Sequence, residues 1–128
     1  MTEYRHRPAL RGQRVLVVED EALVAMLVED GLLDVGATVL GPASTVEEAL
    51  SMIETATSDG GLAAAVLDLN LGGCSVLPVA DKLASLGVPF VIATGCGEGC
   101  DTGGHTEAPL LHKPFDLGRL TSAVQELL

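Results

Sequence analysis

The sequence predicts an α/β protein in which a parallel sheet of five strands carries helices on both faces. Short apolar segments rich in Val, Leu and Ile alternate along the chain with segments in which apolar residues recur at helical spacing. Strands that alternate with helices in this way favour parallel pairing and one layer of helices on each face. Aromatic residues make up only 2% of the chain, so the core of this sheet is expected to be aliphatic.

Five segments are expected to form the strands. Each is a short run of mostly apolar residues, which is typical of a strand that is buried on both faces. Gly41 and Pro42 are expected to close the second of them, because both residues punctuate regular structure. The five predicted strands cover residues 14–18, 37–40, 63–67, 88–93 and 110–112.

Helices are expected after the first and second strands. Residues 22–35 have helical periodicity, and this pattern places Leu27 on the inward face. Thr45 and Glu48 have the spacing of a capping box, so the second helix should begin beside them. Both helices are predicted to cover the sheet with aliphatic side chains.

Helices after the third and fifth strands are also expected, with Ser75 and Asp116 as their N-caps. The stretch between the fourth and fifth strands departs from this rhythm. Residues 95–108 contain five glycines, and each glycine in a helix costs about 1 kcal/mol relative to alanine. The fourth helix is therefore expected to be short or irregular.

Polar residues stand where four of the predicted strands end. Glu19 and Asp20 follow the first strand, and Asp68 follows the third. Thr94 and Lys113 follow the fourth and the fifth. In an open parallel sheet the carboxyl ends of the strands lie along one edge, where ligands bind. We therefore expect three carboxylates, a hydroxyl and an ammonium around one site.

Three neighbouring carboxylates repel one another unless a cation lies between them. Mg²⁺ prefers oxygen ligands and usually takes one or two carboxylates together with phosphate oxygens. Asp20 and Asp68 are the expected direct ligands, with the backbone carbonyl of Asn70 as a third. Glu19 is expected to act through a coordinated water. The sequence thus predicts a magnesium site that receives a phosphoryl group.

Asp68 is the expected nucleophile and phosphoacceptor, since phosphoryl transfer needs an in-line nucleophile and positive charge on the phosphoryl oxygens. Thr94 and Lys113 are expected to contact those oxygens. Two alternatives stay open. One is a phosphorylation-independent binding module. The other is a phosphatase with an aspartyl nucleophile, but Asn70 stands where that class has its general acid and cannot exchange a proton.

The net charge of −11 excludes some partners. Four of the seven basic residues lie in the first fourteen, so residues 1–12 are expected to form a flexible basic segment before a domain at 13–128. The acidic remainder repels nucleic acids and anionic membranes. No secretory signal or apolar run of about 20 residues is present, and three cysteines fit a reducing cytoplasm.

The cysteines invite a metal interpretation. Cys96, Cys100 and His105 have the spacing C-x3-C-x4-H, and Cys74 lies upstream. The second ligand pair of a structural zinc site is missing, so we interpret the cysteines as incidental small residues.

Four motifs make residues 13–128 resemble the receiver domains of two-component response regulators. Such a domain is flavodoxin-like, a (βα)5 three-layer sandwich with strand order 2-1-3-4-5. The resemblance also implies a cis bond before Pro114. The motifs follow the family's order and are Val17-Val18-Glu19-Asp20-Glu21, Val66-Leu67-Asp68-Leu69-Asn70, Ala93-Thr94-Gly95 and Lys113-Pro114-Phe115.

The resemblance implies a stand-alone receiver in the cytoplasm, a monomer or weak dimer. It would take its phosphoryl group from a sensor histidine kinase or a histidine phosphotransfer protein and signal to a downstream protein by direct contact. It would not be an enzyme beyond self-catalysed phosphotransfer and autodephosphorylation.

The chain departs from the family at two places. Leu110 stands where receivers usually carry the aromatic half of their switch, and residues 95–108 replace a regular fourth helix. The segment that ends in Thr94-Gly95 is similar to a subgroup with a Phe-Ala-Thr-Gly signature, found in alphaproteobacterial stress and light signalling. Ile92 and Cys96 depart from that signature.

Overall fold

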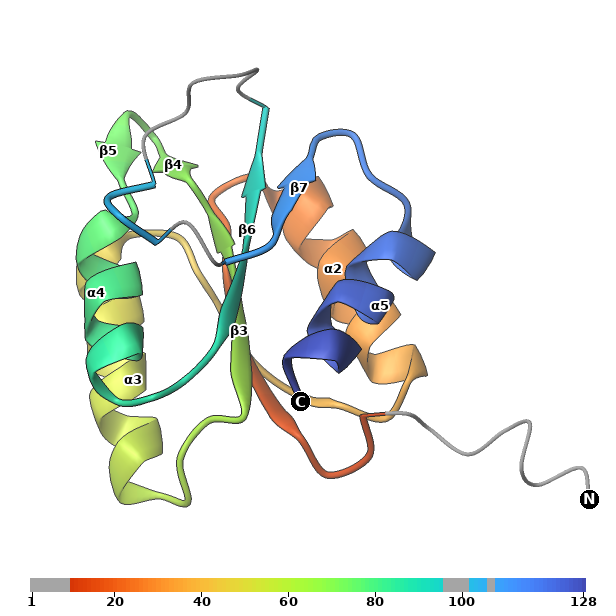
Figure 1. The fold of residues 1–128 in the computed structure, drawn as a ribbon, viewed down its shortest axis with the longest axis horizontal. Coiled ribbons are helices and arrows are strands. Elements are labelled where there is room, and N and C mark those ends of the chain that lie inside the picture. The colour runs from red at the N-terminus through yellow and green to blue at the C-terminus, as the bar shows by residue number, and fades with distance from the viewer. Residues whose placement is uncertain (1–9, 96–101, 106–107) are drawn as a thin grey trace, which may run out of the picture.

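The computed structural model describes residues 10–95, 102–105 and 108–128. In this part of the chain five strands form one parallel sheet with the order β2-β1-β3-β6-β7 (Figure 1). In chain order this is the predicted 2-1-3-4-5 arrangement, so the expected flavodoxin-like fold is confirmed. The strands are β1 (Arg14–Val18), β2 (Thr38–Ala43), β3 (Ala64–Asp68), β6 (Phe90–Thr94) and β7 (Leu110–His112).

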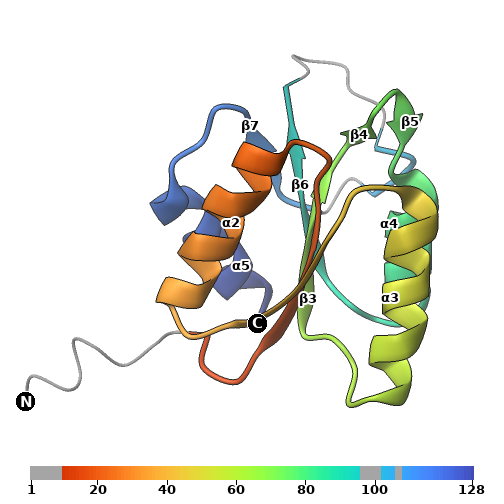
Figure 2. The ribbon, with the colours of Figure 1, turned by 180° about the vertical axis from the view of Figure 1, so that it is seen from behind.

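The described helices form a layer on each side of the sheet (Figures 1 and 2). One layer contains α2 (Ala22–Asp34) and α5 (Leu117–Leu127). The other contains α3 (Val46–Ser58) and α4 (Leu77–Ser85). The three-layer sandwich follows from the alternation of strands and helices along the chain.

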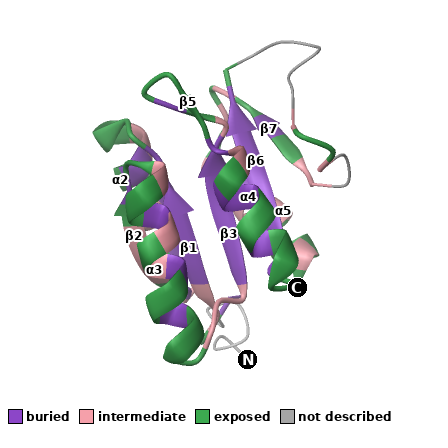
Figure 3. Cartoon of the chain, turned by 90° about the vertical axis from the view of Figure 1, so that its left-hand side faces the viewer, coloured by how far each residue is buried: buried purple, intermediate pink, exposed green. Residues whose placement is uncertain are grey.

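The two cores lie on opposite faces of the sheet, as the alternation of side chains along a strand requires. In β6, Ile92 packs in the core under α3 and α4, whereas Val91 packs in the core under α2 and α5. Figure 3 shows the central strands β1, β3 and β6 almost entirely buried, whereas the outer sides of the helices are exposed. Both cores are largely aliphatic, as the composition predicts.

The second strand does not end at Gly41 and Pro42, so this prediction was wrong. The strand continues to Ala43, and its register against β1 shifts by one residue, as in a β-bulge. A Cβ on Gly41 would lie 2.6 Å from the carbonyl oxygen of Val17, and the φ of +101° also favours glycine. The bulge lets the strand pass through Pro42, which has no N–H to donate.

Helix α2 buries most of the expected face, with Val28 and Leu32 in the core, but one residue of that face points outward. Leu27 was placed inward but is 56% exposed, because apolar residues surround this helix and its periodicity is weak. Close packing against α5 constrains α2 at Gly31. A Cβ on Gly31 would lie 3.1 Å from Leu117 Cδ2, so only a residue without a side chain fits there without a shift of Leu117. The buried residues of α2 are Ala25, Val28, Gly31 and Leu32.

Two predicted helix starts are confirmed. The N-cap Thr45 accepts the Glu48 N–H on Oγ1 at 3.1 Å, and Glu48 Oε1 reaches back past the N-cap to accept the Ser44 N–H at 2.8 Å, a bond pattern close to that of a capping box. Asp116 Oδ1 accepts the Arg119 N–H at 2.8 Å at the start of α5. These side chains satisfy backbone donors that the first helical turn leaves unpaired.

The start of α4 lies one residue later than expected. Its N-cap is Val76, not Ser75, although Ser75 Oγ still accepts the Leu77 N–H at 3.1 Å. The reason is a small antiparallel hairpin that the sequence analysis did not predict. It consists of β4 (Asn70–Leu71) and β5 (Cys74–Ser75), so Ser75 ends a strand.

No helix lies between β6 and β7 in the described residues, consistent with the short or irregular helix expected there. Cys96 and Cys100 lie outside the described residues. The described turn at 102–105 is attached to the layer of α4 through His105. Its Nε2 lies 2.7 Å from Asp81 Oδ1, and its ring meets Phe90 edge-on at 5.3 Å between centroids.

The expected flexible segment at 1–12 falls mostly on residues 1–9, which lie outside the described part. Leu10 is buried and donates its N–H to the Val35 carbonyl at 2.8 Å. Among the residues that are described, no helix is both long and apolar enough to cross a membrane.

Replacing His105 by alanine should lower the free energy of unfolding by about 1 to 2 kcal/mol, because it removes a hydrogen bond to a carboxylate and an edge-to-face ring contact. Urea denaturation measures the change. The matched control is His112→Ala, which removes an exposed imidazole from β7. Equal effects of the two substitutions would contradict the attachment through His105.

Candidate functional site

The polar residues expected at the strand ends meet at one edge of the sheet. The arrowheads of β6 and β7 point to this edge at the top of Figure 1. A pocket of about 730 Å³ opens there between the strand ends and the β4–β5 hairpin. Its lining includes Asp20, Glu21, Asp68, Asn70, Thr94 and Lys113.

Backbone hydrogen bonds fix the strand ends that carry these side chains. The Glu19 N–H donates to the carbonyl of Ala43 at 2.9 Å, just where β1 ends. The Lys113 N–H donates to the carbonyl of Thr94 at 2.7 Å, which ties the end of β7 to the end of β6. The functional side chains therefore start from backbone positions set by the sheet itself.

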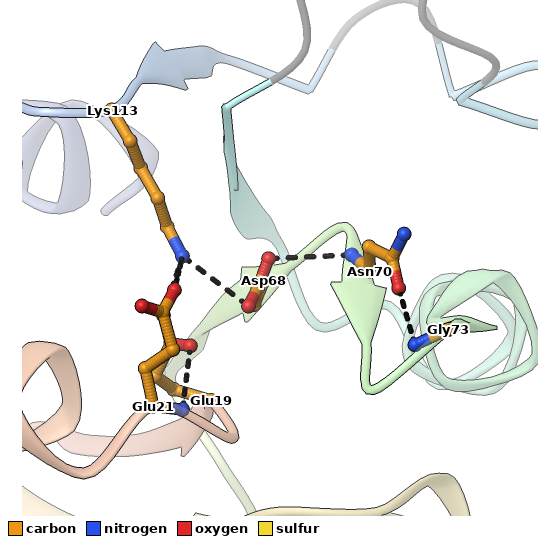
Figure 4. Close-up of polar contacts among 6 residues, drawn as sticks. All are labelled: Glu19, Glu21, Asp68, Asn70, Gly73 and Lys113. Atoms are coloured by element: carbon orange, nitrogen blue, oxygen red, sulfur yellow. Dashed lines mark hydrogen bonds and ion pairs between the residues drawn. The ribbon is translucent and has the colours of Figure 1, made fainter.

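Lys113 reaches across this edge to three acids (Figure 4). Its Nζ lies 3.0 Å from Glu19 Oε1, 3.2 Å from Glu21 Oε1 and 3.3 Å from Asp68 Oδ2. The Lys113 side chain is 18% exposed, so this ion cluster is screened by water only in part. The ammonium holds carboxylates from the ends of two strands in one place.

Burial makes the carboxylates of this cluster hard to ionise together. Burial and a hydrogen bond with Asp68 raise the pKa of Glu19 from 4.5 to about 7, against the opposing effect of the Lys113 ammonium. Burial alone would lower the pKa of Lys113, but its contacts with Glu19 and the charge of Asp68 outweigh this and raise it. Lys113 therefore stays charged, while the buried acids compete for its single positive charge.

Backbone donors hold the other carboxylate oxygens. Glu19 Oε2 accepts the Glu21 N–H at 3.1 Å, and Asp68 Oδ1 accepts the Asn70 N–H at 3.3 Å. Asn70 Oδ1 in turn accepts the Gly73 N–H at 2.8 Å, so its side chain stabilises the hairpin turn (Figure 4). The backbone of Asn70 therefore lies directly beside Asp68.

The donor set fits a hard divalent cation. Carboxylate oxygens of Glu19, Asp20 and Asp68 lie within 4.8 Å of one another. With Glu21, four acidic side chains and the one ammonium of Lys113 lie around the site, so acidic groups outnumber basic ones and all offer oxygen atoms. Oxygen ligands of this kind suit Mg²⁺. The structure thus brings together the side chains that the sequence analysis assigned to a magnesium site.

Thr94 ends β6, and Leu110 begins the neighbouring strand β7. Thr94 is buried and lines the same pocket as Asp68 and Lys113. Leu110 is 40% exposed, so the position that usually holds an inward-turning aromatic carries a partly exposed aliphatic side chain here.

Sequence reasoning missed the role of Glu21. Its position at the start of a predicted helix favours a solvated acid, because a negative charge is stabilised there without any partner. Glu21 is the N-cap of α2, but its side chain makes no capping hydrogen bond and contacts Lys113 instead. Lys113 lies far from Glu21 in the sequence, so no local sequence signal indicates this contact.

A parallel sheet in the order 2-1-3-4-5, with an acid cluster and a lysine at its carboxyl edge, defines a receiver domain. The chain belongs to the receiver domains of response regulators. It is 41% identical to SdrG from Sphingomonas melonis Fr1, and the match covers 90% of this chain and 95% of that one with a TM-score of 0.75. SdrG has also been solved in a BeF3-activated conformation, with 37% identity, a TM-score of 0.72 and coverage of 95% and 98%.

Two further relatives are consistent with a receiver domain. The phyllosphere-induced regulator PhyR of Methylorubrum extorquens is 32% identical over 125 residues, which are 97% of this chain but 46% of PhyR. The chain thus spans about half the length of this curated relative. TrrA from Thermotoga maritima, solved in complex with Mg(2+)-BeF, is 25% identical with a TM-score of 0.74 and coverage of 91% and 99%. A scan against protein-family models finds no match.

The raised pKa of Glu19 predicts how pH changes the stability of the protein in EDTA. Between pH 4.5 and about 7 the folded protein holds a proton on Glu19 that the unfolded chain releases. The stabilisation from this group is complete below pH 4.5 and is lost as pH rises to about 7. Urea denaturation across this range should show that wild type loses more stability than Glu19→Gln.

The control is Glu54→Gln, which removes an exposed acid from α3 and should keep the wild-type pH dependence. If Glu19→Gln loses as much stability as wild type over this range, Glu19 does not titrate as expected.

Proposed function

We propose that this chain is the receiver of a response regulator and accepts a phosphoryl group on Asp68 in a Mg²⁺-dependent reaction. The main support is the position of the Lys113 ammonium, 3.3 Å from Asp68 Oδ2 in a pocket that also contains the acid cluster. A carboxylate nucleophile beside a fixed positive charge is what phosphoryl transfer needs.

The proposed donor is a phosphohistidine on a sensor histidine kinase or on a histidine phosphotransfer protein. A carboxylate oxygen of Asp68 attacks phosphorus, the P–N bond breaks, and its electron pair returns to the imidazole nitrogen. Autodephosphorylation reverses the modification, because water attacks phosphorus, the Asp68 oxygen leaves as carboxylate, and inorganic phosphate is released. The chain catalyses only these two reactions of its own side chain.

Each side chain of the site has a proposed part. Asp20, Asp68 and the backbone carbonyl of Asn70 would bind Mg²⁺ directly, and Glu19 would bind it through a water. When bound, Mg²⁺ supplies positive charge to the phosphoryl oxygens. Lys113 donates from Nζ to one of these oxygens, and Thr94 donates from its hydroxyl to another.

The relatives support this assignment. SdrG has a BeF3-activated conformation, and TrrA has been solved with Mg(2+)-BeF, a beryllofluoride complex that carries the metal we propose here. We further propose that the modified chain signals by direct contact with a downstream protein. The phosphoryl group carries about two negative charges in place of the single charge of the Asp68 carboxylate, and these attract the strand ends that carry Thr94 and Lys113.

A phosphatase is less well supported by the geometry. The residue two positions after Asp68 is Asn70, whose side-chain oxygen accepts the Gly73 N–H and which has no proton to exchange at neutral pH. The same experiments separate these functions, because a phosphatase would turn over many equivalents of a phosphate ester, whereas a phosphoacceptor takes up one equivalent.

Incubation with acetyl phosphate and Mg²⁺ should add one phosphoryl group to Asp68, with release of acetate. Asp68→Asn should abolish the adduct, because an amide oxygen is a poor nucleophile. Intact-protein mass spectrometry measures the modification, and EDTA should also prevent it. Asp30→Asn is the matched control on the exposed side of α2 and should be phosphorylated like wild type. An unchanged adduct in Asp68→Asn would refute the assignment.

Asp20→Asn should weaken Mg²⁺ binding by about tenfold or more, since it removes the charge of a proposed direct ligand. Isothermal titration calorimetry with MgCl₂ measures the affinity. Asp30→Asn is again the control, because it removes the same charge at a distance from the pocket. Equal losses in both variants would indicate a general charge effect rather than coordination.

A further inference from the structure

The contact between Glu21 and Lys113 has no part in the proposed phosphoryl transfer. An ammonium has three N–H donors. Lys113 directs hydrogen bonds to Glu19 at 3.0 Å and Glu21 at 3.2 Å, and it makes an ion pair with Asp68 at 3.3 Å. Three carboxylates thus already compete for the group that a phosphoryl oxygen would need.

The three acids differ in what they lose if the ammonium leaves. The Glu19 side chain is 4% exposed and Asp68 is 7% exposed, whereas Glu21 is 61% exposed. A buried carboxylate without its counter-ion is strongly destabilised, because water cannot replace the lost interaction. The carboxylate of Glu21 regains water as soon as it is released. Glu21 is therefore the partner that Lys113 gives up at least cost.

We propose that Glu21 is a positioning residue that holds the Lys113 ammonium while Asp68 is unmodified and releases it when Asp68 carries a phosphoryl group. This inference rests on the proposed function of Asp68. It assigns different parts to two acids two residues apart: Glu19 keeps its contact with Lys113 in both states, and Glu21 loses its contact.

The release also reaches a second surface of the domain. Glu21 borders the pocket above Asp68 and a neighbouring pocket of about 500 Å³ between α2 and residues 113–117. Phosphorylation would therefore leave an unpaired carboxylate at the entrance of this neighbouring pocket. The charge of that entrance would depend on the state of Asp68, although no residue of the entrance is modified.

A crystal structure of the full chain with Mg²⁺ and beryllofluoride tests the inference directly. The expected result is that Lys113 Nζ contacts the beryllofluoride and Glu19, while the Glu21 carboxylate lies beyond ion-pair distance. A Glu21–Lys113 contact as short as the present 3.2 Å would overturn the inference.

A titration tests the same inference through the affinity of the chain for beryllofluoride. Followed by NMR at constant Mg²⁺, beryllofluoride should half-saturate Glu21→Gln at a concentration about two- to fivefold lower than wild type, because no exposed ion pair has to break. Glu54→Gln, the same exchange on α3, should match wild type. Equal midpoints for wild type and Glu21→Gln, or equal shifts in both variants, would overturn the inference.

These results also separate the inference from the proposed function. If wild type takes up beryllofluoride at Asp68 and the Glu21 contact survives, only the part of Glu21 is refuted. If wild type takes up neither beryllofluoride nor a phosphoryl group from acetyl phosphate, the proposed function and this inference fail together.

Discussion

The ion cluster around Lys113 is the interaction on which the carboxyl edge of this domain depends. Two nearly buried carboxylates, Glu19 and Asp68, come from the ends of adjacent strands and repel each other. One ammonium within 3.3 Å of both offsets that repulsion. Burial and the hydrogen bond with Asp68 raise the pKa of Glu19 more than the ammonium lowers it, so a further positive charge at the site would favour the ionised carboxylate.

The sheet makes this concentration of charge possible. Four residues of β1, from Val15 to Val18, are buried, as are all of β3 and β6, and the strands have aliphatic cores on both faces. The apolar interior leaves the strand ends as the place where polar side chains can gather. Backbone hydrogen bonds at those ends limit their movement, because Glu19 is tied to β2 and Lys113 to β6. The stability of the sheet thus holds in place a group of acids that would otherwise separate.

The sequence allowed much of this architecture to be predicted, because local signals agreed with the global fold. Apolar strands that stop at acids place Asp20 and Asp68 at one edge of the sheet. The capping box at Thr45 and the cap at Asp116 depend on neighbours three residues away, so spacing alone identifies them. Such features need no knowledge of distant contacts.

Three of the features that were not predicted depend on contacts between distant segments. The bulge in β2 exists because Gly41 fits against the backbone of Val17. The close fit of α2 to α5 at Gly31 also joins segments that are far apart in the sequence. Glu21 acquires its partner from a strand near the other end of the chain. Hydrophobic periodicity and short-range spacing carry no information on any of these contacts.

The hydrogen bond from the Lys113 N–H to the Thr94 carbonyl has a mechanical consequence. It ties the tips of β6 and β7 directly to each other, although a long glycine-rich connection separates them in the sequence. A displacement of either tip has to carry the other with it or stretch this hydrogen bond. In a chain with Leu110 in place of an aromatic ring, this main-chain linkage still connects the two tips that carry Thr94 and Lys113.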